Sequence, residues 1–387
     1  MTAGRFVENV DFRKNVINTV DPGVDPNVAP MKQHEFVTGA EWAITPSLSF
    51  TTRYARKRLD NTIEDIGVTD NLGFYIGNPG PGYGDLLHRA LPGSGITAPL
   101  CTACPIQPKA IREYDGLEFR VTKTASHYFV SAFYTYSKLS GNYPGLTSTF
   151  TSDGAGGRQS PNNNRSFDSP QQQFDAHGNV VNGRLPTDRP NTFSAFGSVR
   201  GKSRLGESQL GLSQAIYQGT PVSTCWPAGS STSACQFVEQ QGNWVNLARA
   251  ADGTISATSI THDRRTPAYL QTSGTLSHYI HLSKDHEERR LGAEFNVINI
   301  LNQHAVTSLY NIALTTATYP NQASTAANPT GFNFLPLLTG WDYVGISNNG
   351  VPGQTTNNGN KTISNRYGQP NLFQNGRQIR IQIAYKF

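Results

Sequence analysis

The sequence predicts an all-β fold, namely part of an antiparallel transmembrane β-barrel with about nine strands and long extracellular loops. Two observations support this prediction. Residues 376–387 alternate apolar and polar side chains without a break, and short turns alternate with long loops along the chain. A strand with a different solvent on each face shows period-two alternation. Transmembrane barrels have short turns at one rim and long loops at the other.

The composition permits this fold and argues against a bundle of membrane helices. The 387 residues are 36% hydrophobic and 15% charged. No stretch approaches the roughly 20 consecutive apolar residues that a transmembrane helix needs, whereas a barrel strand needs an apolar side chain only at every second position. The net charge of +5 comes from scattered basic residues, so we expect no nucleic-acid partner.

Four predicted hairpins precede the final strand. Each joins two strands of about 10 residues, which is enough to cross a bilayer at a tilt. The predicted strands span residues 34–44 and 48–58, 113–124 and 127–138, 189–200 and 207–218, and 267–282 and 290–301. The segments between these hairpins are rich in Gly, Pro and Asn and show no sustained periodicity, so we expect long loops there. Loops of this length are uncommon in compact domains.

Charged side chains fall on one face of the predicted strands, and we expect this face to line the lumen. An Arg or Lys at the lipid midplane would cost ~2–4 kcal/mol. The solvated face of a soluble sheet would fit the same charges, which therefore support β structure more than a membrane. The predicted lumen-facing residues are Glu35, Glu41, Arg53, Glu118, Arg120, Glu294 and Arg380.

The four cysteines all lie in predicted loops. Cys101 and Cys104 form a C-x-x-C pair, and Cys225 lies ten positions before Cys235. In an oxidising compartment we expect two local disulfides, with half of a zinc site and free thiols as the alternatives. Nucleophile-elbow, P-loop and zinc-protease motifs are absent from the sequence, so we predict neither an enzyme, a metal site nor a cofactor.

Several segments resemble the C-terminal barrel of TonB-dependent outer-membrane receptors. The resemblance is strongest to the Oar-like group, which carries an N-terminal carboxypeptidase-regulatory-like domain. The similar segments keep the same order along the chain, from about residue 25 to the end. They are residues 25–30 with 35–41, Tyr134–Lys138 with Gly141–Tyr143, Asp188–Asn191, Glu294–Asn302 and the terminal Phe387.

The resemblance implies a larger barrel than this chain provides. Such receptors have 22 strands around an N-terminal plug, together with a TonB-contacting segment and a signal peptide. We therefore expect residues 1–33 to be a lead-in segment and residues 34–387 to be a partial barrel without plug or signal peptide. Nine strands cannot close by antiparallel pairing, so the edge near residue 34 would be unpaired.

The resemblance also implies a function and partners. We expect uptake of an unidentified small ligand through the Gram-negative cell outer membrane. The expected partners are outer-membrane lipid, the barrel-assembly machinery and, only through a plug domain, TonB. The end of the last strand resembles the signal that this machinery reads, in the residues Ile381, Ile383, Tyr385 and Phe387.

Two other functions compete with transport. One is a structural or adhesion role in the outer membrane without transport. The other is a soluble β-sandwich that binds carbohydrate, in which loop aromatic residues would stack on sugars. The candidate stacking residues are Tyr83, Trp226, Trp244 and Trp341.

Overall fold

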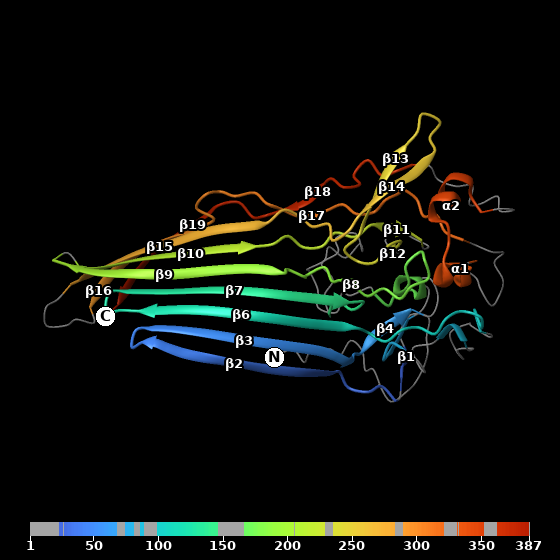
Figure 1. The fold of residues 1–387 in the computed structure, drawn as a ribbon. Helices are drawn as coiled ribbons and strands as arrows, with labels where there is room; N and C mark the ends of the chain where they lie inside the picture. Colours follow the sequence, from blue (N-terminus) through green and yellow to red (C-terminus); the bar gives the residue numbers. More distant parts are fainter. Residues whose placement is uncertain are drawn as a thin grey trace, which may run out of the picture.

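The computed structural model describes most of the chain in segments. These are residues 23–25, 27–67, 74–80, 86–88, 99–145, 166–204, 206–228, 235–282, 289–320, 331, 333–351 and 362–386. Long strands occupy one end of the molecule, and short strands and two short helices occupy the other (Figure 1). Among the described residues, no helix has the length and apolar character needed to cross a membrane.

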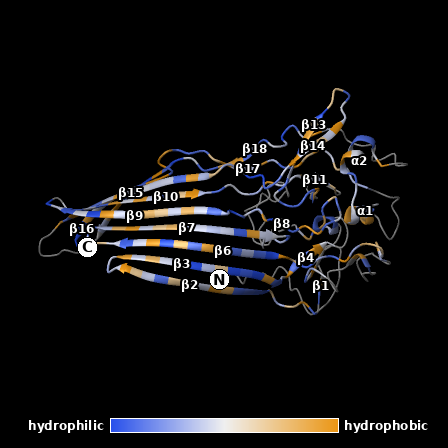
Figure 2. Ribbon diagram, in the orientation of Figure 1, coloured by the Kyte–Doolittle hydropathy of each residue, from blue (hydrophilic) through white to orange (hydrophobic). Residues whose placement is uncertain are grey.

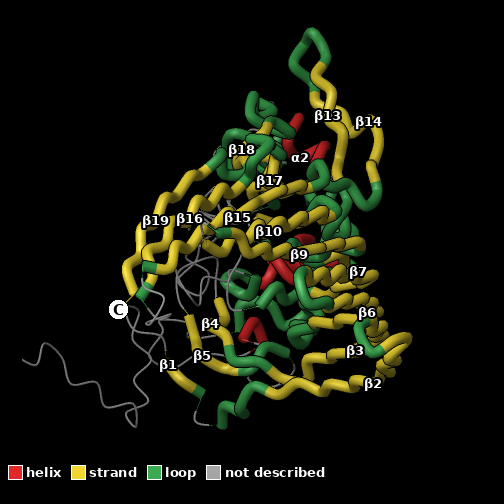
Figure 3. The backbone as a smooth tube through the Cα atoms, turned by 90° about the vertical axis from the view of Figure 1, so that its left-hand side faces the viewer, coloured by secondary structure: helices red, strands yellow, loops and turns green. Residues whose placement is uncertain are grey.

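Nine long strands form one antiparallel sheet, which confirms the predicted fold class and the number of strands. Along the described part of the chain the sheet is open, with β2 at one edge and β19 at the other, and it is strongly curved (Figure 3). The strands, in sheet order, are β2 (Lys32–Thr45), β3 (Leu48–Asn61), β6 (Arg112–Thr124), β7 (Tyr128–Gly141), β9 (Asn191–Ser203), β10 (Gly206–Tyr217), β15 (Tyr269–His281), β16 (Arg290–Ile298) and β19 (Gln378–Lys386).

Two strand boundaries differ from the sequence prediction for identifiable reasons. Strand β16 ends at Ile298 and not at 301, because Asn299 has φ 57° and Asn302 has φ 51°. Left-handed backbone interrupts a strand, and Asn tolerates it better than most residues. The turn predicted over 201–206 is much tighter, because β9 and β10 stay paired as far as Ser203 opposite Gly206.

The register gives most of the sheet one apolar face and one polar face, while the apolar side of β3 and β6 next to the cap carries the ion-paired Arg58 and Asp115. Residues directly opposite each other on neighbouring strands point to the same side, so the pairs can be followed across the sheet. Banding along the front strands β2, β3 and β6 in Figure 2 shows this alternation. On the apolar face, one row runs through Leu210, Leu276, Phe295 and Ile381, and another through Trp42, Phe50, Val121 and Ala132.

The predicted loops are not structureless, and this is the main departure from the sequence prediction. Their described residues (62–111, 142–190, 218–268 and 299–377), here called the cap, gather mainly at one end of the sheet (Figure 1). They contain β4 (Glu64–Gly67), β5 (Phe74–Gly77), β8 (Gly183–Arg184), β11 (Cys225–Pro227), β12 (Cys235–Phe237), β13 (Trp244–Arg249), β14 (Ile255–Thr261), β17 (Val306–Leu309), β18 (Pro370–Phe373), α1 (Phe334–Thr339) and α2 (Tyr343–Asn349). β1 (Gly23–Val24), from the predicted lead-in segment, pairs in parallel with β5.

Candidate functional site

The cap has its own hydrophobic core. Residues that lie more than two hundred positions apart in the sequence pack together in it, which makes the cap one folded body and not four separate loops. The fully buried members include Leu87 from the first long loop, Trp226 from the third, and Leu337 and Leu338 from the fourth. Burying such side chains stabilises a fold by about 1.5–3 kcal/mol each before the cost of ordering the chain.

One buried amide links three segments of this core. The side chain of Gln236 donates through Nε2 to the backbone oxygens of Phe174 at 3.0 Å and Leu337 at 2.8 Å. Its Oε1 accepts a hydrogen bond from the indole Nε1 of Trp341 at 3.1 Å. A buried polar side chain with its donors and acceptor in use fixes the segments that it joins, because breaking any bond leaves an unpaired buried group.

The cap tryptophans are core residues, which corrects the sugar-stacking assignment. Trp226 is fully buried and meets the ring of Tyr343 edge-on, with centroids 4.8 Å apart. Trp244 lies between the ring of Tyr367, stacked at 4.2 Å, and the guanidinium of Arg264 at 4.3 Å. Their faces are therefore occupied by the protein itself. Trp341 is 9% exposed, and Tyr83 lies outside the described residues.

Burial changes the ionisation of the core tyrosines. It raises the pKa of Tyr343 to about 12. The pKa of Tyr367 is also raised by burial, although its hydroxyl bonds to Thr224 Oγ1 at 2.6 Å and to the backbone oxygen of Val245 at 2.7 Å. Both hydroxyls stay protonated at neutral pH and act as structural hydrogen-bonding groups.

A buried ion pair fixes the cap to the rim of the sheet. Asp188, just before β9, is fully buried and lies 2.6 Å from Arg265, which is itself only 8% exposed. The same carboxylate accepts a hydrogen bond from the backbone N–H of Leu139 on β7 at 2.6 Å, and Arg184 lies 3.6 Å away. The carboxylate thereby holds together the two ends of the second long loop and the end of the third.

A pocket of about 320 Å³ opens next to this ion pair. It lies where β9, β10 and β15 join the cap, and its walls also include parts of β17 and β18. The lining mixes hydroxyl groups, an amide, one guanidinium and small apolar side chains, and it contains no Asp, Glu or Lys. The lining residues are Pro186, Thr187, Arg189, Thr220, Pro221, Val222, Ser223, Thr266, Tyr269, Thr307, Ser308, Leu309, Asn311 and Leu372.

The two faces of the sheet differ in chemistry as well as in hydropathy. On the polar face, Arg53 and Glu118 form a bidentate pair, with Nε at 2.9 Å and Nη2 at 3.1 Å from the carboxylate oxygens. The apolar face is open: Phe36 is 60%, Ile381 73% and Ile383 75% exposed. This much exposed apolar surface, continuous over nine strands, is uncommon in a soluble monomer and indicates a surface that meets lipid or protein.

Comparison with known proteins finds a similar transporter sequence and a distant structural likeness. No protein-family model matches the chain. Over 201 residues, or 51% of the chain, it is 27% identical to the TonB-dependent transporter Oar of Myxococcus xanthus, and this match spans only 16% of that transporter's length. A structure of P. aeruginosa FpvA bound to heterologous pyoverdines resembles 76% of this chain and 26% of its own, with 11% identity and a TM-score of 0.36, a likeness too distant to bear on function.

About half of this chain is therefore similar in sequence to a TonB-dependent transporter. The predicted resemblance is confirmed by the sequence match to Oar, and the long strands of this chain form an open antiparallel sheet.

All seven charges that we expected to face the lumen of the receptor-like barrel lie on the polar face. The register connects them: Glu35 is opposite Lys57, Arg53 opposite Glu118, and Glu294 opposite Gln382. Glu41, Arg120 and Arg380 stand an even number of positions from these residues on the same strands, so they point to the same face. The complete set is Glu35, Glu41, Arg53, Glu118, Arg120, Glu294 and Arg380. That this face lines a lumen stays a prediction.

A cluster of three phenylalanines interrupts the polar face. Phe129 and Phe133 both pack on Phe196, with ring centroids 5.7 and 5.8 Å apart, and the guanidinium of Arg120 lies 4.9 Å from the Phe133 ring centroid. A cation over an aromatic face is stabilised by the ring's electron density, so Arg120 is held by this aromatic neighbour together with the hydrogen bond from its Nε to Thr122 Oγ1 at 3.1 Å.

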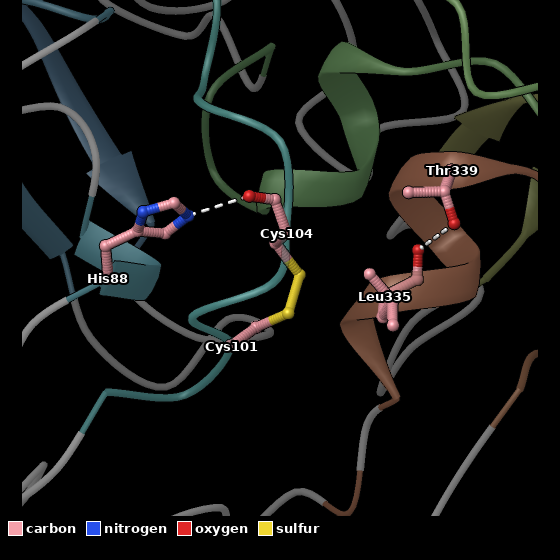
Figure 4. The surroundings of a disulfide bond; sticks show 5 residues. All are labelled: His88, Cys101, Cys104, Leu335 and Thr339. Carbon is pink, nitrogen blue, oxygen red and sulfur yellow. Dashed lines mark hydrogen bonds between the residues drawn. A yellow bond between two sulfur atoms is a disulfide. The ribbon is translucent and has the colours of Figure 1, made fainter.

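The four cysteines lie in the cap. Cys101 and Cys104 are joined by a disulfide, with Cα atoms 5.4 Å apart, and the ring of His88 is directed at the backbone oxygen of Cys104 at 2.9 Å (Figure 4). Cys225 is also disulfide-bonded. Antiparallel pairing of β11 with β12 places Cys235 opposite Pro227. The predicted pairing of Cys225 with Cys235 stays a prediction.

The proposed assembly signal occupies the exposed edge of the sheet. Ile381 and Ile383 project from the apolar face of β19, next to Phe295 and Ala293 of β16. Tyr385 continues this row opposite Leu291, and Phe387 lies outside the described residues.

The described residues contain no cluster of three or more His, Cys, Asp and Glu suited to a metal ion.

Sequence reasoning missed the pocket and the Asp188–Arg265 pair. Both depend on residues that come together from different loops, and no local pattern links them. One signal was available: Asp188 and Arg189 stand in the Asp188–Asn191 segment, which carried the family resemblance but was given no structural role.

Proposed function

We propose that this chain forms part of the wall and cap of an outer-membrane TonB-dependent transporter that takes up a small ligand. The continuous apolar face of the nine-strand sheet is the single observation that supports this proposal most. Its exposed side chains would meet lipid, while the charged face would line a hydrated lumen. The relative that matches half of the chain is named as a TonB-dependent transporter.

The energetics favour this placement over a free sheet in water. Exposed apolar surface costs about 25 cal/mol per Å² when it is left in water, and the apolar rows cross all nine strands. Two ion pairs join charged residues of the polar face, Arg53 with Glu118 and Lys57 with Glu35, and charges of this kind would be tolerated in a hydrated interior. The open edges of β2 and β19 would have to be covered by further strands.

The cap would supply the ligand-facing part of the transporter. Under this proposal it lies outside the cell and its disulfides form in an oxidising compartment. The barrel-assembly machinery would insert the chain, and contact with TonB would require a plug domain. This is a transport role and not a catalytic one.

Fractionation of cells that express the chain behind an outer-membrane targeting signal tests the proposal. We expect recovery in the outer-membrane fraction, and a band that migrates differently in gels before and after heating. Recovery as a soluble monomer without detergent would overturn the membrane placement. Correct insertion without any ligand uptake by the complete protein would instead favour the structural or adhesion role.

A further inference from the structure

The pocket beneath the cap contains a guanidinium with few partners. Arg189 lines the pocket beside Tyr269, Thr220 and Thr266. Its Nη1 donates to the backbone oxygen of Gln218 at 2.7 Å. This is the only hydrogen bond of the guanidinium among the described residues, which leaves most of its five N–H donors available.

The guanidinium of the neighbouring Arg265, in contrast to that of Arg189, has several hydrogen-bond partners. Its Nη2 lies 2.6 Å from the Asp188 carboxylate and 2.7 Å from Asp263, and its Nη1 donates to two backbone oxygens. Arg189 is half-buried, and no carboxylate is among the groups that act on it. Burial lowers the pKa of Arg189, with Arg265 contributing in the same direction and the rings of Tyr217 and Tyr269 opposing it. The guanidinium nevertheless stays charged at physiological pH.

The remaining walls provide complementary chemistry. Hydroxyl groups of Thr220 and Thr266 lie within 3.4 Å of each other, and Leu309 and Leu372 offer apolar surface. A pocket of about 320 Å³ is at the lower end of the range for sites that hold small organic ligands. A partly buried charge without a counter-ion is costly, and a bound anion removes that cost.

We propose that this pocket binds a small organic anion whose carboxylate or phosphate group pairs with Arg189. The planar fork of a guanidinium matches both groups in bidentate geometry. The threonine hydroxyls donate to the remaining oxygens, and the apolar part of the ligand lies against Leu309 and Leu372. The inference deepens the proposed transport function by naming a ligand class, and it rests on that function only for the ligand's passage, not for its binding.

Calorimetric titration of the purified full chain tests the proposal, in detergent micelles or in buffer if the chain is soluble without detergent. The probes are benzoate, phenyl phosphate and neutral benzamide. We expect benzoate or phenyl phosphate to bind at least about tenfold more tightly than benzamide, because a hydrogen bond to a charged group is worth about 1.5–3 kcal/mol. The tighter of the two anions identifies the preferred group.

Three variants locate the binding. Arg189→Gln is expected to weaken anion binding about tenfold or more, and Arg189→Lys to weaken it less, because the charge is kept and the fork is lost. Lys202→Gln removes one positive charge from the opposite end of β9 and is expected to leave binding unchanged. If Arg189→Gln does not fold, as judged by circular dichroism, the affinities of the other two variants decide. Arg189→Lys should then bind the anion more weakly than Lys202→Gln.

Three outcomes would overturn the pocket assignment. They are equal affinity for benzamide and the anions, undiminished anion binding by the Arg189 variants, and no binding of any probe by the unaltered chain. Each leaves the membrane placement intact, because fractionation measures that independently. A soluble chain that binds anions through Arg189 would instead overturn the transport proposal and keep the pocket.

Discussion

The Asp188 carboxylate lies 2.6 Å from Nη2 of Arg265, and both side chains are almost completely shielded from solvent. This pair connects the base of the second long loop to the base of the third. A buried pair of this kind contributes little net stability compared with apolar residues of the same shape, but removing one partner is expensive. The junction therefore makes the cap sensitive to single substitutions at its base.

Asp188→Asn is expected to destabilise the cap by ~3–5 kcal/mol, because the Arg265 charge loses its main buried partner. Urea unfolding followed by tryptophan fluorescence measures this, since Trp226, Trp244 and Trp341 all lie in the cap core. Glu118→Gln is the matched control. It breaks a more exposed ion pair with Arg53 and should cost no more than about 1 kcal/mol. Equal losses for the two variants would contradict the assigned role of Asp188.

Neighbouring positions on β19 distinguish the two faces of the sheet. Ile381→Arg places a charge on the apolar face, which costs ~2–4 kcal/mol at a lipid midplane. Gln382→Arg places the same charge on the polar face opposite Glu294, where we expect little effect. The fraction of chain that becomes heat-modifiable in outer membranes is the readout. Equal assembly of the two variants would count against the lipid-facing assignment.

The His177–Glu239 pair predicts a pH effect in the cap. The His177 ring nitrogen lies 3.0 Å from the Glu239 carboxylate, and this hydrogen bond raises the pKa of His177 above its ordinary value, against a smaller effect of burial. A raised pKa in the folded state gives stability that is fully present below the unfolded-state pKa of about 6.5 and is lost as the pH rises through the folded-state value. The pair is largely exposed on the histidine side, so the effect should stay below about 1 kcal/mol.

Titration of the His177 ring by NMR tests this directly. Glu239→Gln should lower the pKa of His177 towards its ordinary value and flatten the pH dependence of cap unfolding above pH 6.5. An unchanged His177 titration in the variant would refute the coupling.

Deletion of Phe387 is expected to impair membrane assembly more than the folding of any single hairpin. The alternation in the sequence predicts that Phe387 ends the apolar row of Ile381 and Ile383, and an aromatic residue there would suit the membrane interface. Heat-modifiability gels compare the deletion with the point variant Arg377→Ala, which lies just before β19. Normal insertion of the deletion variant would show that Phe387 is not part of the assembly signal.

Sequence patterns predicted the sheet well because its determinants are local. Period-two alternation assigns a face to each residue, and once neighbouring strands pair in register the assignment extends across the sheet. Glu35 and Arg380, at opposite ends of the chain, therefore fall on the same predicted face.

The cap could not be predicted in this way. Leu337 packs in the same core as Leu87, yet no periodicity links residues so far apart. The same holds for the Asp188–Arg265 junction and the pocket beside it, whose walls come from five different segments. Glycine, proline and asparagine content indicates where regular strands stop, but not how the resulting loops pack on one another.

Because the buried core lies in the cap, the cap and the sheet should contribute differently to the heat-capacity change of unfolding. Removing apolar surface from water produces the large heat-capacity change of unfolding. Calorimetry of the chain should therefore record this change mainly from the cap, where Trp226 and Leu337 are enclosed. The long strands, with Ile381 and Ile383 exposed, bury little apolar surface of their own, so their melting should depend on the detergent or lipid that surrounds them. The chain would then show two unfolding transitions. The transition of the cap would depend on the exposure of apolar side chains to water, and that of the long strands on the surrounding detergent or lipid.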